Sequence, residues 1–91
     1  MNLCFFIGKV CSNINFEFIL NSKDISVCIF DIELSNGSII KVKGYNEIAD
    51  YCYINLKENI IVSIEGYIAN NQEIVIENIN NEGTNIDEEL V

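Results

Sequence analysis

The sequence predicts an all-β protein, a five-stranded barrel with a short helix between its third and fourth strands. Hydrophobic residues make up 49% of the 91-residue chain, and eighteen residues are isoleucine, whose branched side chain favours strands. No proline interrupts the apolar stretches. Five of these stretches have the character of strands separated by polar turns, and one segment between them has a helical period instead. The length suits a single domain with one core.

The predicted strands follow one another in the order of a small barrel. They are Leu3–Val10, continuing past a bend near Ser12 as Phe16–Leu20, then Ile25–Leu34, Ile39–Tyr45, Ile60–Ala69 and Glu73–Ile79. After the third strand the period becomes helical, with Asn46 placed as the N-cap. The apolar face of this helix carries Ile48, Tyr51, Cys52 and Leu56. Three strands, a helix and two strands is the order of an OB barrel. An SH3-like barrel is the alternative, although it does not require this helix.

The turn after the second strand decides which face of the third strand is buried. Asn36-Gly37 is typical of a two-residue hairpin loop, but that register would place Lys41 and Lys43 on the same face as Phe30. We therefore predict an odd-numbered loop, with Gly37 in the left-handed conformation and a bulge. The predicted register sets the buried residues Phe30, Ile32 and Leu34 opposite Gly44, Val42 and Ile40.

The same register pairs oppositely charged residues on the outer face of this hairpin. Glu33 is predicted opposite Lys41, and Asp31 opposite Lys43. Two of the five lysines would then be neutralised within the molecule. In the last hairpin the predicted outer pairs are Tyr67 with Val75 and Glu65 with Glu77.

The charge of the chain is strongly negative. Five lysines and no arginine stand against fourteen acids, which gives a formal charge of −9. We assign residues 1–81 to the barrel domain and residues 82–91 to an acidic, flexible tail, and without this tail the charge is still −5. A surface of this sign argues against strong nucleic-acid binding, which normally rests on neutralising phosphates with basic residues.

Several classes of function lack their characteristic residues. The four cysteines are scattered and there is no histidine, so we predict no metal site and no cofactor. The cysteines are expected to be small core residues in a reducing compartment: Cys4, Cys11, Cys28 and Cys52. Apolar runs are far shorter than the roughly 20 residues of a membrane span, and no signal-peptide pattern opens the chain, so we expect a cytoplasmic protein. Without histidine, a phosphate-binding glycine loop or a nucleophile elbow, we expect no enzyme.

Three segments of the chain have the spacing of a known family. They are Met1-Asn2 with Phe6–Val10, the alternating Phe30–Leu34, and Lys41–Gly66. The last is the most specific, because its apolar strand, aromatic residue, helix and Val-x-Ile-Glu-Gly strand follow without insertion. Over residues 1–79 the chain resembles the bacterial single-stranded DNA-binding protein family, including its primosomal replication protein B branch.

The resemblance implies single-stranded DNA as a partner and assigns roles to particular residues. Tyr45 matches a base-stacking aromatic residue of the family, and Lys41 matches a phosphate-contacting residue. Ile39 stands where the family has a stacking tryptophan, so one stacking platform is missing. The acidic end, Asp87–Val91, is similar to a tail that docks protein partners, but it lacks the terminal phenylalanine. The resemblance also favours a homo-oligomer, either a dimer or a tetramer.

Two functions of different classes are consistent with these residues. The first is weak single-stranded DNA binding, in DNA replication, repair or transfer, by aromatic stacking and a few phosphate contacts. Its candidate residues are Lys9, Lys41, Lys43, Tyr45 and Tyr67. The second is an OB-fold protein-interaction module, a regulatory or accessory subunit that has lost most of its DNA affinity. Neighbouring exposed apolar residues mark such an interface, and the candidates are Ile25, Val27, Ile29 and Ile39.

Overall fold

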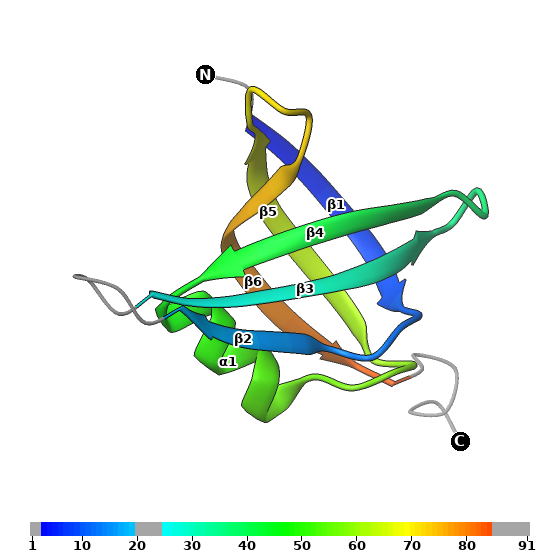
Figure 1. The fold of residues 1–91 in the computed structure, drawn as a ribbon. Coiled ribbons are helices and arrows are strands. Elements are labelled where there is room, and N and C mark those ends of the chain that lie inside the picture. The colour runs from blue at the N-terminus through cyan, green and yellow to red at the C-terminus, as the bar shows by residue number, and fades with distance from the viewer. Residues whose placement is uncertain (1–2, 20–24, 85–91) are drawn as a thin grey trace.

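The computed structural model describes residues 3–19 and 25–84, in which five strands close into a barrel and a sixth extends its edge (Figure 1). The elements are β1 (Leu3–Val10), β2 (Asn15–Ile19), β3 (Ile25–Leu34), β4 (Ile39–Tyr45), α1 (Glu47–Asn55), β5 (Ile61–Ile68) and β6 (Ile74–Gly83). The strand order is β1-β5-β6-β4-β3-β2, and an additional pairing of β1 with β3 closes the barrel. The predicted all-β barrel with one short helix is therefore confirmed, and it is consistent with an OB fold.

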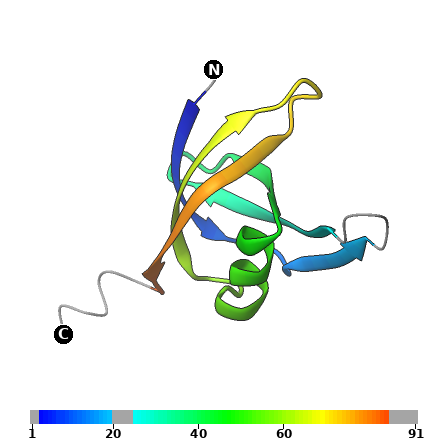
Figure 2. The same ribbon diagram turned by 90° about the vertical axis from the view of Figure 1, so that its left-hand side faces the viewer.

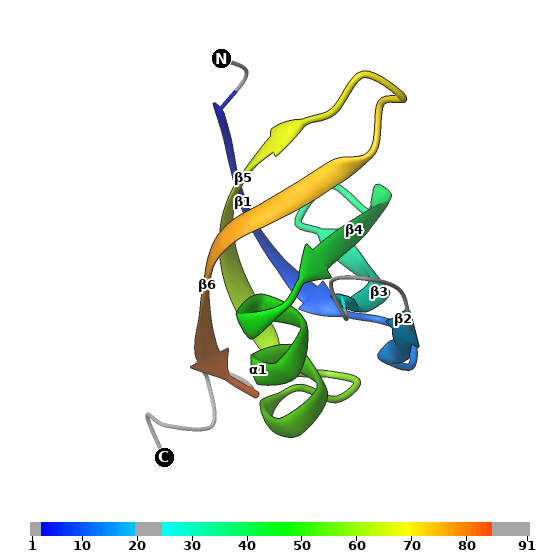
Figure 3. The same ribbon diagram turned by 60° about the vertical axis from the view of Figure 1, so that its left-hand side comes forward.

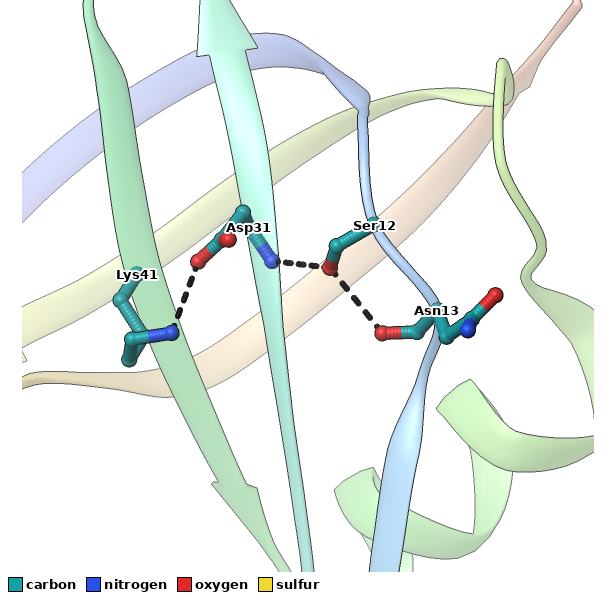
Figure 4. Close-up of polar contacts among 4 residues, drawn as sticks. All are labelled: Ser12, Asn13, Asp31 and Lys41. Carbon is teal, nitrogen blue, oxygen red and sulfur yellow. Dashed lines mark hydrogen bonds and ion pairs between the residues drawn. The ribbon is translucent and has the colours of Figure 1, made fainter.

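The bend in the first predicted strand divides it into two strands that pair with different parts of β3. The last residues of β1, Gly8–Val10, pair with Ile32–Leu34 of β3, and β2 pairs with Ile25–Ile29 of the same strand. Between these two pairings, no residue of β1 or β2 is paired with Asp31. The side chain of Ser12 bonds to the backbone of Asp31 instead (Figure 4). The Ser12 hydroxyl accepts the Asp31 N–H at 2.8 Å and donates to the Asn13 carbonyl at 3.0 Å. The Cys11 N–H donates to the Asp31 carbonyl at 2.9 Å. The bend is thus held by hydrogen bonds to one residue of β3.

The β3–β4 hairpin has the predicted parity but a different register. Phe30 faces Val42 and Ile32 faces Ile40, so the apolar residues do point inward, two positions away from their predicted partners. The loop is tighter than predicted, because Leu34 already pairs with Ser38. The Asn36 side chain accepts the Ser38 N–H at 2.9 Å and stabilises this short turn, while Gly37 has a φ of 87°. The residues facing one another outside are Asp31 with Lys41, Glu33 with Ile39 and Ile29 with Lys43, so the predicted pairs Glu33–Lys41 and Asp31–Lys43 are wrong.

The left-handed backbone conformation of Gly37 leads us to expect that larger side chains at this position destabilise the protein. Replacing Gly37 with valine should lower the free energy of unfolding by about 1 kcal/mol or more, because a β-branched residue is strained at positive φ. A Cβ at this position would meet no atom within 4 Å, so the cost comes from the backbone alone. Asn tolerates this conformation, and Gly37→Asn is the matched control. Urea denaturation curves that place the two variants at the same midpoint would contradict the left-handed turn.

The last hairpin contains a bulge that separates two like charges. Tyr67 faces Val75 as predicted, but a register shift at Glu65 sets this residue opposite Asn78 instead of Glu77. The Asn78 side-chain amide donates to the Glu65 carboxylate at 2.9 Å. The predicted juxtaposition of two carboxylates is therefore wrong, since the additional residue in β6 moves one of them away.

β6 extends further than the sequence predicts. It continues to Gly83, and the Ser63 hydroxyl donates to the Glu82 carboxylate at 2.8 Å. The first residues of the predicted acidic tail therefore belong to the barrel. The remainder of that segment, residues 85–91, lies outside the described residues.

α1 follows β4 and lies across one end of the barrel, and Figures 2 and 3 show the β5–β6 hairpin at the opposite end. Ala49 and Cys52 are its buried residues. Asn46 occupies the N-cap position as predicted, but it has a φ of 55° and makes no side-chain capping bond. Its backbone instead turns the chain out of β4, with its N–H donated to the Ser26 carbonyl.

The core lies between this helix and the inward faces of the strands. Its largest fully buried side chains are Phe30, Ile32, Ile64, Val10, Val42, Val62, Cys28 and Cys52. Two of the four cysteines are thus core residues as predicted, while Cys4 and Cys11 are half-buried. A hydrogen bond with Cys28 and burial raise the pKa of the Cys52 thiol, which stays neutral at physiological pH.

Within residues 3–19 and 25–84 no helix is long and apolar enough to cross a membrane. The same residues form no cluster of three or more metal-ligating side chains.

Candidate nucleic-acid interface

The outward face of β4 borders an open groove of about 290 Å³. Every second residue of β4 points outward, because side chains alternate along a strand. The other wall is the start of β6 and the loop before it, which the short parallel pairing of Val42 with Ile74 holds against β4. The groove is lined by Ile29, Ile40, Lys41, Val42, Lys43, Gln72, Glu73 and Ile74.

Both groove lysines form ion pairs within the molecule. The Lys41 ammonium lies 3.1 Å from the Asp31 carboxylate, in the network with Ser12 that Figure 4 shows. The Lys43 ammonium lies 2.7 Å from the Glu73 carboxylate. The side chain of Lys41 is 67% exposed and that of Lys43 only 20%. The prediction that both lysines face away from the core and are neutralised is therefore confirmed, with different partners from the predicted ones.

The second ion pair shifts the pKa values of both its members. The hydrogen bond from Lys43 lowers the pKa of Glu73, and a second hydrogen bond from Asn71 lowers it further. The hydrogen bond to Glu73 raises the pKa of Lys43. A carboxylate with a lowered pKa remains ionised at neutral pH. The ion pair is therefore present throughout the neutral range; it is lost as the pH falls through the lowered pKa of Glu73 or rises through the raised pKa of Lys43.

The two candidate aromatic platforms lie beside the groove. Tyr45 is two residues beyond Lys43 on the same side of β4, and its side chain is 39% exposed. Tyr67 is half-buried on β5. Ladder pairing places Val75 between Lys43 and Tyr67, so all three side chains lie on the same outer face of the barrel.

Lys9 lies apart from the other candidates. It is exposed at the end of β1, where its ladder partners are Glu33 and Ile61. It lines a second depression, together with Glu33 and Ser35, and not the groove beside β4. The structure thus brings together four of the five candidate DNA-binding residues.

The predicted apolar interface on β3 and β4 is mostly covered. Val27 is only 7% exposed, so the expectation that it lies on the surface is wrong. β3 is flanked by β2 and β4, and Val27 is enclosed between Glu17 and Tyr45. Ile25 and Ile29 are half-buried, and Ile29 lines the groove. Ile39, at 63% exposed, is the open member of this set.

Two features of the surface were missed by sequence reasoning. Gln72 and Glu73 reach the groove from a loop distant in sequence, and only the β4–β6 pairing reveals them. The largest exposed apolar row in a strand is on β1, where Leu3, Phe5 and Ile7 are each more than half exposed. The apolar run containing them had the character of a buried strand, so composition carried no signal of exposure.

The chain has the fold of single-stranded DNA-binding domains. It superposes with a TM-score of 0.76 on the SSB domain of a Synechococcus protein, at 16% identity over 88% of this chain and 94% of that chain. It is similar to a mitochondrial single-stranded DNA-binding protein of S. cerevisiae, with a TM-score of 0.77 and 14% identity over 92% of this chain and 97% of the other. The single-stranded DNA-binding protein of Thermus aquaticus has a TM-score of 0.81 and 10% identity over 93% of this chain and 42% of its own. No family model and no curated protein matches the chain.

At these levels of identity the comparisons establish the fold, and the resemblance inferred from the sequence is confirmed at that level. The residues carrying function must be argued from this chain itself, because one fold hosts many functions.

Proposed function

We propose that this protein is a non-enzymatic, cytoplasmic OB-fold protein that binds single-stranded DNA weakly, in DNA replication, repair or transfer. The observation that supports this most directly is the grouping of Tyr45, Lys41 and Lys43 beside one groove. OB folds use this part of the barrel, the central strand pair and the loop between the last two strands, to bind oligonucleotides. Exposed aromatic rings stack on bases, and lysines contact phosphates.

The charges at the same groove favour weak binding of DNA over strong binding. Each of its two lysines already has a carboxylate partner, Asp31 or Glu73. A phosphate must replace these partners, and the net charge of −9 repels a polyanion at longer range. Stacking on Tyr45 therefore contributes more of the affinity than phosphate contacts do.

Competition between single-stranded and duplex DNA tests this proposal. A labelled oligothymidine should bind at low ionic strength more tightly than a duplex of the same length, because base faces are available for stacking only in the single strand. Lys41→Ala should weaken binding slightly and flatten the salt dependence, while Lys57→Ala, which changes an exposed lysine outside the groove, should leave the slope unchanged. Equal affinity for duplex and single strand would contradict stacking.

We also propose that the protein forms a homo-oligomer, with β1 as its contact surface. Leu3, Phe5 and Ile7 form an exposed apolar row on this strand. β1 pairs with β5 on one side, but it pairs with β3 only at Gly8–Val10, so among the described residues no strand pairs with Phe5–Ile7 on the β3 side. Unpaired apolar edges favour pairing with another chain.

Phe5→Lys should therefore shift the oligomer to monomer in light scattering. Tyr53→Lys, at an exposed aromatic residue of α1, is the control and should leave the mass unchanged. A monomeric wild-type protein at tens of micromolar would refute oligomerisation.

The protein-interaction module remains the second candidate. A separate apolar surface on β2 and α1 favours it, because Phe18, Tyr53 and Ile54 are all exposed and Phe16 contacts Tyr53 with ring centroids 4.7 Å apart. The acidic segment 82–91 is a further proposed contact for a protein partner.

A further inference from the structure

Glu73 occupies the groove at the place where a phosphate would bind. Its carboxylate is held at both oxygens: Oε2 lies 2.7 Å from the Lys43 ammonium, and Oε1 accepts a hydrogen bond from the Asn71 amide at 2.6 Å. The Glu73 N–H in turn donates to the Asn71 side-chain oxygen at 3.2 Å. The carboxylate is therefore positioned by its own loop, and the lysine contact is one part of a local network.

The loop that carries Glu73 is tightly closed. The Ala69 N–H donates to the Glu73 carbonyl and the Gln72 N–H to the Ala69 carbonyl, each at 2.8 Å. Gln72 has a φ of 66°, which completes the reversal of the chain. These bonds hold the backbone of the loop, and the Asn71 amide then orients the Glu73 carboxylate towards Lys43.

Lys43 is the more protected of the two groove lysines. Its ammonium contacts Glu73 at a shorter distance than Lys41 contacts Asp31, and its side chain is far less exposed. Ion pairs with little exposure are screened less by water and salt than exposed ones. A phosphate competes with a carboxylate at both lysines, but Lys41 is largely open to solvent, whereas Lys43 is mostly covered and its ammonium contacts Glu73 more closely.

We propose that Glu73 is a built-in competitor for phosphate, an acidic clamp that occupies Lys43 in the free protein and limits the affinity for single-stranded DNA. This inference rests on the proposed function. On binding, a phosphate oxygen takes the place of Glu73 Oε2, and the released carboxylate acquires a cation from solution. Fewer cations are then released overall, so the salt dependence of binding is shallower than the number of contacts would suggest.

The test compares Glu73→Gln with Glu77→Gln in binding to labelled oligothymidine across a series of salt concentrations. Both variants remove one negative charge, but Glu77 is exposed on β6, does not line the groove and makes no ion pair with the residues described. Glu73→Gln should bind about two- to fivefold more tightly than wild type, the range expected when a partly exposed ion pair no longer has to be broken. Its slope of log K against log salt should be steeper by about 0.7, for one additional phosphate neutralised. Glu77→Gln should change the affinity by less than about twofold, because its charge acts only at a distance.

A third variant separates the clamp from the change in charge. Asn71→Ala keeps every charge and removes the amide that positions the carboxylate, so it should strengthen binding by a smaller factor than Glu73→Gln. Equal strengthening by Glu73→Gln and Glu77→Gln would overturn the clamp and leave the proposed function intact. Measurable binding by wild type, strengthened by Glu73→Gln and not by Glu77→Gln, would support both. Failure of wild type and all variants to bind at low salt would refute the proposed function and the clamp with it.

Discussion

Replacing Phe30 with alanine is expected to lower the free energy of unfolding by about 3–5 kcal/mol, the range for removing a buried aromatic ring. Phe30 is the largest fully buried side chain among the described residues, and it faces Val42 across the β3–β4 hairpin. Its removal leaves a cavity between the strands that position the groove. Denaturation in urea, followed by circular dichroism, measures the change directly.

Phe18 is the matched control for this change. It is also a phenylalanine in a strand, but more than half of its side chain is exposed on β2. Phe18→Ala should alter the free energy of unfolding by no more than about 0.5 kcal/mol. Comparable losses in the two variants would mean that the barrel is not built around Phe30.

Replacing Tyr45 with alanine is expected to reduce the affinity for single-stranded DNA by about 1–3 kcal/mol, the contribution of one base-stacking ring. The side chain of Tyr45 is sufficiently exposed to meet a base, and it lies next to Lys43 at the groove. The loss should be similar for oligonucleotides of different sequence, because every base offers a π face. Fluorescence anisotropy at low salt measures it.

Two controls make this result specific. Tyr45→Phe keeps the ring and should retain most of the affinity, which separates stacking from hydrogen bonding by the hydroxyl. Tyr53→Ala removes an exposed tyrosine from α1, outside the groove, and should have little effect. An equal loss in Tyr53→Ala would place the binding surface on the helix side of the barrel.

The elements of the barrel were predictable from local patterns, and their register was not. Alternation along β3 and β4 determines which residues point inward, so the parity of the hairpin followed from Phe30 and Lys41. The register depends on how soon the turn closes, and the hydrogen bond from Ser38 to Asn36 makes that turn shorter than predicted. The bulge beside Glu65 is a similar case: it shifts the inward alternation of β6 between Ile76 and Ile79, whereas the pairing predicted for Glu65 assumed unbroken alternation.

The candidate site was predictable where it lies on one strand. Lys41, Lys43 and Tyr45 alternate along β4, so a single pattern placed all three on the outer face. Glu73 enters the groove through the parallel pairing of β4 and β6, a contact between distant parts of the chain. Val27 has the same outward parity, but its burial depends on strands on both sides, which the alternation of one strand does not contain.

The measurement that tests the central claim most directly is the salt dependence of wild-type binding to a long oligothymidine. Three lysines are candidates for phosphate contacts: Lys41 and Lys43 at the groove, both with carboxylate partners, and Lys9, which lies apart from the groove. With about 0.7 counterions released per phosphate neutralised on a single strand, we predict measurable binding at low ionic strength, with a slope of log K against log salt no steeper than about −2. No binding to oligothymidine even at the lowest salt would contradict the account and favour the protein-interaction module.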